Sequence, residues 1–254
     1  MNQDYKEKLS RSIENKYSNL EMRIMEDIVR RIKQYGKITS TADWQINRLV
    51  ALGNSSEDIE KMLKETLDAS YPEMFELYDK VIDWEYVRNK DIYEQINARF
   101  IPYEENEQLQ QLTDALRRQT QEELENITRS LGFYLDYGNG KRVLTPLAQV
   151  YQGYLDNSVM DIASGAFDYN STLRRVVTQL TNSGLRTIDY ASGRSYRVNV
   201  AARMAVMTGI TQLSAKICEY NMEKLGCEYV EVSWHAGARP SHQTWQGKVY
   251  KWNK

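Results

Sequence analysis

The sequence predicts a mainly α-helical protein in which several long amphipathic helices precede a small α+β C-terminal module with a β-hairpin. Three observations support this fold class. Apolar residues recur at steps of three and four along most of the chain, which is the period of a helix with one buried face. Near the C-terminus the period becomes two, which is typical of a strand. The chain has only 13 glycines and 4 prolines, too few for an all-β protein with many turns.

The first expected element is a long helix that ends at Gly36. One stripe of apolar side chains follows its helical period and consists of Leu9, Ile13, Tyr17, Leu20, Ile24, Ile28, Ile32 and Tyr35. Because no helical partner is adjacent in sequence, we expect this stripe to dock on another polypeptide. The docking residues are Leu9, Ile13, Leu20, Ile24 and Ile28. Packing of the stripe onto its own domain is the alternative.

Further helices are expected before residue 132. They run from Thr41 to Gly53, from Asn54 to Ser70, from Pro72 to Phe100 and from Pro102 to Leu131. Gly53 and Pro72 mark boundaries, because glycine is common after the last turn of a helix and proline is favoured in the first.

A domain boundary is expected near Gly132–Thr145, where the acidic helical part ends and where Gly138-Asn139-Gly140 signals a tight turn. Residues 1–140 are expected to form a helical N-terminal region, and residues 141–254 a second module. In that module we expect a helix after Thr145-Pro146, a shorter one that stops at Gly184, a polar loop over residues 190–196, and a long helix over residues 196–225.

The C-terminal segment is predicted to fold as a hairpin. Val230, Val232 and Trp234 share one face of a strand, and a second strand returns after Gly247. We expect a structural motif formed by Trp234, His235, Arg239, Pro240, His242, Trp245 and Gly247. In it the two tryptophans pack on either side of the hairpin and cover the Arg239 guanidinium, whose donors bond within the loop.

The sequence gives little support for a metal site or a catalytic site. The chain's two histidines, both in this segment, cannot alone complete a zinc site, and a third ligand from Cys227, Glu228 or Glu231 is not compelled by the spacing. No nucleophile elbow, phosphate-binding glycine loop or C-x-x-C pair is present, so we expect no metal, no cofactor and no catalysis. The alternative is a nuclease-like or toxin-like enzyme module that uses His235, Arg239 and His242.

The charge is unevenly distributed although the net charge is only −2. Acidic residues predominate over residues 57–107, and basic residues predominate over residues 171–216. Six arginines of the basic stretch are suited to contacting DNA phosphates without reading sequence: Arg174, Arg175, Arg186, Arg194, Arg197 and Arg203. A solvated surface is the alternative.

No run of 18 apolar residues occurs, so no membrane-spanning helix is predicted. The two cysteines are expected to be buried thiols.

Several motifs together resemble a known family. They are KITSTADWQIN at residues 37–47, SGRS at 192–195, HAGARPSH at 235–242 and WQGKVY at 245–250. The chain thereby resembles the tailed-phage minor capsid protein 2 family and, more loosely, the Mu F-type minor head proteins. Family members continue past the hairpin into a further Asn-Cys-Arg-His-like cluster, so a metal or DNA site that needs this cluster is expected to be incomplete here.

The resemblance implies a structural minor head protein of a tailed phage or prophage, located in the virion near the portal vertex and in the host cytoplasm during assembly. Its implied partners are the portal protein, the major capsid protein and packaged DNA. Residues 1–140 would dock on the portal or capsid, and residues 141–254 would form the minor-head-type module. Several copies per virion, a role in head assembly or DNA ejection, and no membrane contact are also expected.

Overall fold

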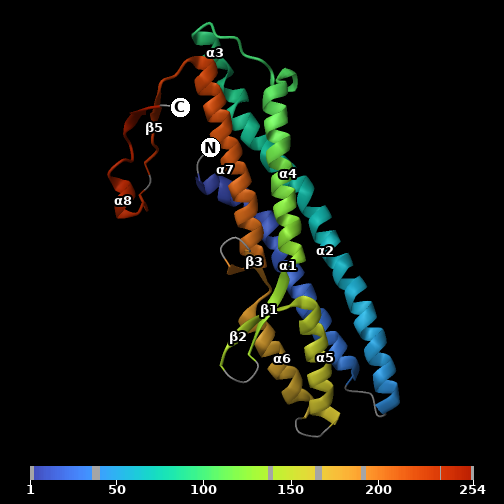
Figure 1. The fold of residues 1–254 in the computed structure, drawn as a ribbon. Helices are drawn as coiled ribbons and strands as arrows, with labels where there is room; N and C mark the ends of the chain where they lie inside the picture. The colour runs from blue at the N-terminus through green and yellow to red at the C-terminus, as the bar shows by residue number, and fades with distance from the viewer. Residues whose placement is uncertain are drawn as a thin grey trace. The chain divides into compact units, whose positions relative to one another are not determined.

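The computed structural model describes residues 3–35, 41–136, 140–163, 168–189, 193–234 and 236–252, with side chains except at 3–4, 9, 34–35, 41–55, 155, 158–163 and 189. The protein is mainly α, as predicted (Figure 1). The helices are α1 (Gln3–Tyr35), α2 (Thr41–Glu85), α3 (Lys90–Gln95), α4 (Glu107–Arg129), α5 (Leu147–Ala163), α6 (Tyr169–Ser183), α7 (Val198–Leu225) and α8 (Pro240–Gln243). None of the described helices is both long and apolar enough to cross a membrane.

The strands form two sheets. The larger has the order β2-β1-β3-β4 and consists of β1 (Leu131–Asp136), β2 (Arg142–Pro146), β3 (Arg186–Asp189) and β4 (Arg194–Arg197). The smaller pairs β5 (Tyr229–Glu231) with β6 (Val249–Lys251). All neighbouring strands are antiparallel. The prediction of a polar loop over residues 190–196 is therefore wrong for its last residues, which belong to β4 and pair with β3. Gly36 and the Gly138-Asn139 turn lie outside the described residues.

The chain divides into two compact units. We call residues Tyr78–Ala115 and Ile210–Lys254 the hairpin unit, and residues Asn2–Leu77 and Leu116–Gly209 the sheet unit. Each unit combines segments from both sides of residue 140, so the predicted boundary does not separate them. Helices α2, α4 and α7 contribute residues to both units.

The α1 stripe is buried within the sheet unit. Ile13, Leu20, Ile24 and Ile28 have no exposed surface, and α1 packs on α5 and α6, which lie beside it in Figure 1. The premise that this stripe lacks a partner within the chain is therefore wrong, and these four side chains are not available for docking. The side chain of Leu9 is outside the described residues.

Helix α2 continues through both predicted breaks, at Gly53 and at Pro72. Proline inside a helix removes a hydrogen bond and costs about 3 kcal/mol. The buried face nevertheless continues across it, with Met62 and Thr66 before the proline and Met74 after it. Packing of this continuous face outweighs the local cost, which is why sequence signals for a break fail here.

A cluster of tyrosines ends the helix at Glu85 instead of near Phe100. The Tyr86 hydroxyl donates to the Ile101 carbonyl over 2.7 Å, and its ring stacks on Phe100 at 5.0 Å between centroids. Asn106 Nδ2 donates to the hydroxyls of Tyr86 and Tyr220 at 3.0 and 2.9 Å. These buried bonds fix the chain reversal between α2 and α4 within the hairpin unit.

Candidate nucleic-acid interface

The four-stranded sheet has one buried face. Strand pairing places directly opposite residues on the same side of a sheet, and successive residues on alternate sides. Five residues of one face are buried: Leu131, Phe133, Leu135, Thr145 and Thr187. Helices α5 and α6 both contact β1, so this is the face that joins the core of the sheet unit.

The other face, which we call the outer face, carries arginines. Arg186 of β3 lies directly opposite Arg197 of β4, and Gly132 of β1 completes the same row. Tyr134 and Arg142 share this face through the β1–β2 register. Arg142 and Arg197 are exposed, whereas Tyr134 and Arg186 are half-buried. A row of cations on a solvent-facing sheet surface is suited to an anionic partner.

Arg186 is held in a fixed position. Its Nε donates to the Ser183 carbonyl over 3.0 Å, and its Nη1 donates to the Ser195 carbonyl over 3.4 Å. Its guanidinium carbon lies 5.3 Å from the centre of the Tyr134 ring, within cation–π range. Ser183 is the last residue of α6, so Arg186 also places positive charge at the negative end of that helix.

Arg197 lies against Gly184. A Cβ added to Gly184 would come within 2.7 Å of the Arg197 Nε and 2.8 Å of its Nη2, so the guanidinium occupies the space of the missing side chain. Gly184 also has a φ of 65°, which favours glycine. In the described part of the chain, neither Arg197 nor Arg186 makes an ion pair with a carboxylate.

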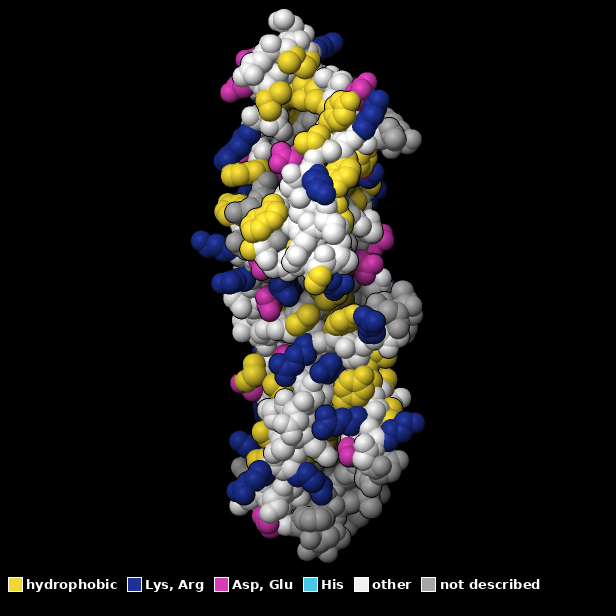
Figure 2. All heavy atoms as spheres, turned by 90° about the vertical axis from the view of Figure 1, so that its left-hand side faces the viewer, with side chains coloured by type: hydrophobic (Ala, Val, Ile, Leu, Met, Phe, Trp, Pro, Cys, Tyr) yellow, Lys and Arg dark blue, Asp and Glu magenta, His cyan; other side chains and the backbone are white. Residues whose placement is uncertain are grey.

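The other arginines predicted to contact DNA are not all brought to this face. Arg174 and Arg175 are exposed on α6. Arg194 lies opposite Asp189, and the register places it on the other side of the sheet. Arg203 on α7 is partly buried, with its Nε 3.7 Å from Glu14 Oε2, so its charge is already balanced. In the lower half of Figure 2, where Figure 1 places β2 and α6, Lys and Arg side chains are accompanied by few Asp and Glu side chains.

Arg142 was missed in the prediction of contact residues. It lies on the outer face opposite Asp136. The signal was present, because Arg142 follows the glycine turn at residues 138–140 and begins an alternating segment. Only the β1–β2 register shows on which face the side chain lies.

The prediction of a C-terminal hairpin is confirmed, but the predicted packing of its two tryptophans over Arg239 is not. Val232 N donates to the Lys248 carbonyl and Gly247 N to the Val232 carbonyl, which extends the pairing beyond β5 and β6. Trp234 is 70% exposed and Trp245 is 40% exposed, so they do not cover the loop. Arg239 is exposed as well, and its donors reach solvent. The expectation of a guanidinium covered by indole rings is therefore wrong.

The remaining motif residues lie at the surface too. Pro240 begins the short helix α8, and Gly247 has a φ of 64°, as a turn glycine requires. The exposed His242 ring lies 5.0 Å from the Trp245 ring. His235 lies outside the described residues.

Among the described residues, no group of three or more His, Cys, Asp or Glu side chains is arranged to hold a metal ion. Cys218 and Cys227 are exposed free thiols, contrary to the expected burial.

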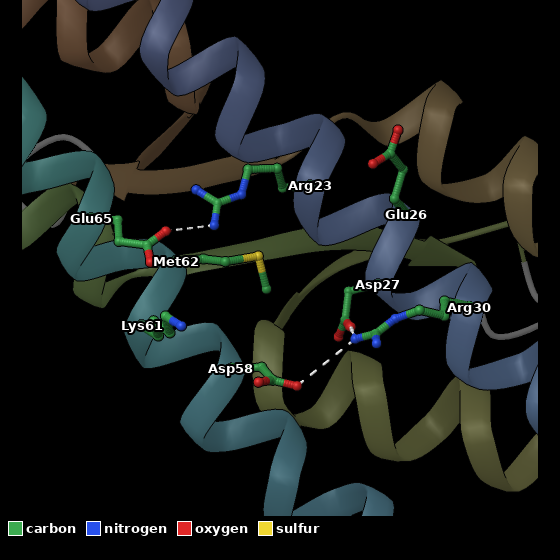
Figure 3. A pocket seen from close by; sticks show the side chains of 8 residues that line it. All are labelled: Arg23, Glu26, Asp27, Arg30, Asp58, Lys61, Met62 and Glu65. Carbon is green, nitrogen blue, oxygen red and sulfur yellow. Dashed lines mark hydrogen bonds and ion pairs between the residues drawn. The ribbon is translucent and has the colours of Figure 1, made fainter.

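A charged pocket of about 380 Å³ lies between α1 and α2 in the sheet unit (Figure 3). Figure 3 shows Arg23 directed from α1 toward Glu65 of α2, and Arg30 directed toward Asp27 and Asp58. The Arg23–Glu65 distance is 2.7 Å. Arg23 and Arg30 of α1 therefore each have an acidic partner on α2. This arrangement is that of an ion-pair network that joins the two helices.

The buried centre of this network is Asp27. It accepts a 2.7 Å hydrogen bond from Arg31 Nε, a 3.0 Å bond from the Tyr151 hydroxyl, and a bond from Arg30. Arg31 also bonds to Asp58 over 2.6 Å. Burial acts to raise the pKa of Asp27, but the bonds from Arg31 and Arg30 and the charge of Arg31 outweigh it and hold the pKa below its usual value. Asp27 is therefore ionised in the folded protein.

Comparison with known protein families matches residues 1–253 to the family described as phage minor capsid protein 2. The match covers nearly the whole chain. No curated protein and no solved structure matches the chain.

Proposed function

The chain belongs to the phage minor capsid protein 2 family, and on this premise we propose that it binds the portal and inner capsid of a tailed phage, where it contacts packaged DNA. In this proposal it acts by binding, without chemistry of its own, and aids head assembly or DNA ejection. Its partners are the portal protein, the major capsid protein and DNA, and several copies are present per virion.

The observation that supports DNA contact is the group of arginines on the outer face of the sheet and on α6. Arg186 and Arg197 face solvent on the outer face of the sheet, and Arg174 and Arg175 are exposed on α6. Arginines held on regular elements neutralise backbone phosphates without contacting bases. This fits packaged DNA, whose sequence a structural protein of the particle does not need to read.

The test is binding of the full chain to a short duplex of arbitrary sequence at several salt concentrations. Each neutralised phosphate is expected to add about 0.9 to the slope of log affinity against log salt. A variant with glutamine at Arg142, Arg174, Arg175, Arg186 and Arg197 should bind weakly with a much shallower slope.

A matched control removes the same charge from the hairpin unit, with glutamine at five exposed positions: Arg88, Lys90, Lys216, Lys224 and Lys248. This variant should keep most of the affinity and slope. Equal losses in both variants would show that net charge alone governs binding. Absence of binding by the wild-type chain at low salt would contradict DNA contact itself.

A further inference from the structure

We infer that Arg186 and Arg197 form a clamp for one phosphate group of the DNA backbone, at the Ser183–Gly184 peptide on the outer face of the sheet. This inference rests on the proposed function, because it names the point at which the sheet unit holds DNA. It differs from general attraction by a basic surface, since it depends on the geometry of two guanidinium groups.

The first step of the argument is that both guanidinium groups converge on one peptide. Arg186 Nε donates to the Ser183 carbonyl, and the Arg197 guanidinium lies within van der Waals distance of Gly184. The two arginines come from neighbouring strands and are directly opposite in register. They therefore present their donors side by side on the same face of the sheet.

The second step is electrostatic. Like charges at directly opposite positions of an antiparallel pair destabilise the sheet. No ion pair balances either guanidinium within the described residues. The acidic residue that the register places on the outer face, Asp136, faces Arg142 at the other end of β1. An anion bound between Arg186 and Arg197 would remove this repulsion.

The third step concerns which donors are available. The bonds from Arg186 Nε and Nη1 to two carbonyls, together with the Tyr134 ring, hold its guanidinium and leave Nη2 for a ligand. Arg197 makes no hydrogen bond in the part of the chain that is described, so the donors that do not face Gly184 are available to a ligand. The helix-end bond of Arg186 thus fixes one half of the clamp, and Gly184 gives room for the other.

The chemistry of these donors favours a phosphate. A guanidinium has donors in a rigid planar fork that matches two oxygens of a phosphate, whereas an ammonium acts as a point charge. The clamp should therefore require arginine at both positions. General electrostatic attraction would accept lysine equally well, and this difference separates the two explanations.

The test uses charge-conserving variants of the full chain. Arg186→Lys and Arg197→Lys should each lower duplex affinity roughly tenfold, the effect of losing one charged hydrogen-bonded contact. Arg11→Lys and Arg118→Lys, at exposed positions of α1 and α4 away from the outer face, are the matched controls and should change affinity less than about twofold. Gly184→Ala keeps every charge but places a Cβ where the Arg197 guanidinium lies, and should reproduce the loss seen in Arg197→Lys.

Circular dichroism melting of each variant shows whether it is folded, which matters most for Gly184→Ala because alanine disfavours a φ of 65°. Wild-type binding together with unchanged affinity in both lysine variants would overturn the clamp and leave the proposed function standing. Failure of the wild-type chain to bind DNA would contradict the proposed function itself.

A last arm identifies the source of the phosphate by replacing chloride with inorganic phosphate at constant ionic strength. Because the clamp holds a phosphate group, inorganic phosphate should displace more duplex than chloride from the wild type, but no more than chloride from Arg197→Lys. Equal displacement by the two salts from the wild type would overturn the clamp. Binding of inorganic phosphate to the wild type without any loss of duplex affinity would show that the site holds free phosphate, and would overturn the assignment to the DNA backbone.

Discussion

Glutamates in place of Ile13 and Ile24 are expected to prevent the sheet unit from folding. Both isoleucines are fully buried on α1, which packs on α5 and α6. Each substitution removes a large apolar side chain, at a cost of about 2–5 kcal/mol, and adds the cost of burying a carboxyl group. Two such changes together remove about 4–10 kcal/mol of apolar packing alone. With two buried carboxyl groups added, the cost is comparable to the whole stability of a typical domain, about 5–15 kcal/mol.

The measurement is the circular dichroism spectrum and melting curve of the double variant. The control places glutamate at Tyr5 and Met22, which lie on the same helix but are 42% and 52% exposed. This control should melt close to the wild type. A double variant of Ile13 and Ile24 with an unchanged melting curve would show that the stripe is not part of the core, and would restore the idea that it docks on another protein.

Removal of the Asp27 carboxylate is expected to destabilise the protein by about 3–5 kcal/mol, the usual effect of breaking a buried ion pair at one partner. Asp27→Ala would remove the buried carboxylate that pairs with Arg31 and leave it the half-exposed Asp58 as an ion-pair partner. It would also leave the Tyr151 hydroxyl without the acceptor it has now at 3.0 Å. Chemical denaturation of the variant measures the loss.

Glu65→Ala is the control for this change. Glu65 pairs with Arg23 on the same two helices, but both side chains are nearly half exposed. Water already solvates such a pair, so its removal should leave the denaturation curve almost unchanged. A similar loss in both variants would mean that burial does not distinguish the two pairs.

The stability of the folded protein is expected to depend on pH through the ionisation of Asp27. The folded-state pKa of Asp27 is lower than that of an unfolded aspartate, which is about 4. Its contribution to stability is therefore fully present above about pH 4 and is lost as the pH falls through the folded-state pKa. Wild-type stability should decline in that acidic range more steeply than the stability of Asp27→Asn, and parallel declines would contradict this role.

Local patterns in the sequence predict much of the helical architecture but not its packing. The periodicity of α1 identifies the buried stripe, yet only the fold shows that α5 and α6 cover it. In α2 the reverse occurs, because the helix continues through the local stop signals at Gly53 and Pro72, and a continuous buried face outweighs the signal at Pro72. Both errors arise because contacts distant in sequence decide the outcome.

The candidate interface is predictable in composition but not in geometry. The basic stretch contains Arg186 and Arg197, but their convergence depends on the β3–β4 register and on the space above Gly184. The same register moves Arg194 to the other side of the sheet and brings Arg142 to the outer face from outside the stretch. A one-residue change in register would reverse each of these placements.

The most direct test of the central claim, that the outer face of the sheet contacts packaged DNA, is ultraviolet crosslinking in intact phage particles. In DNA-filled heads, peptides that contain Tyr134 or residues 186–197 should carry nucleotide adducts, and the same peptides from DNA-free heads should carry none. Adducts confined to the hairpin unit, or absent from the protein in filled heads, would contradict the account.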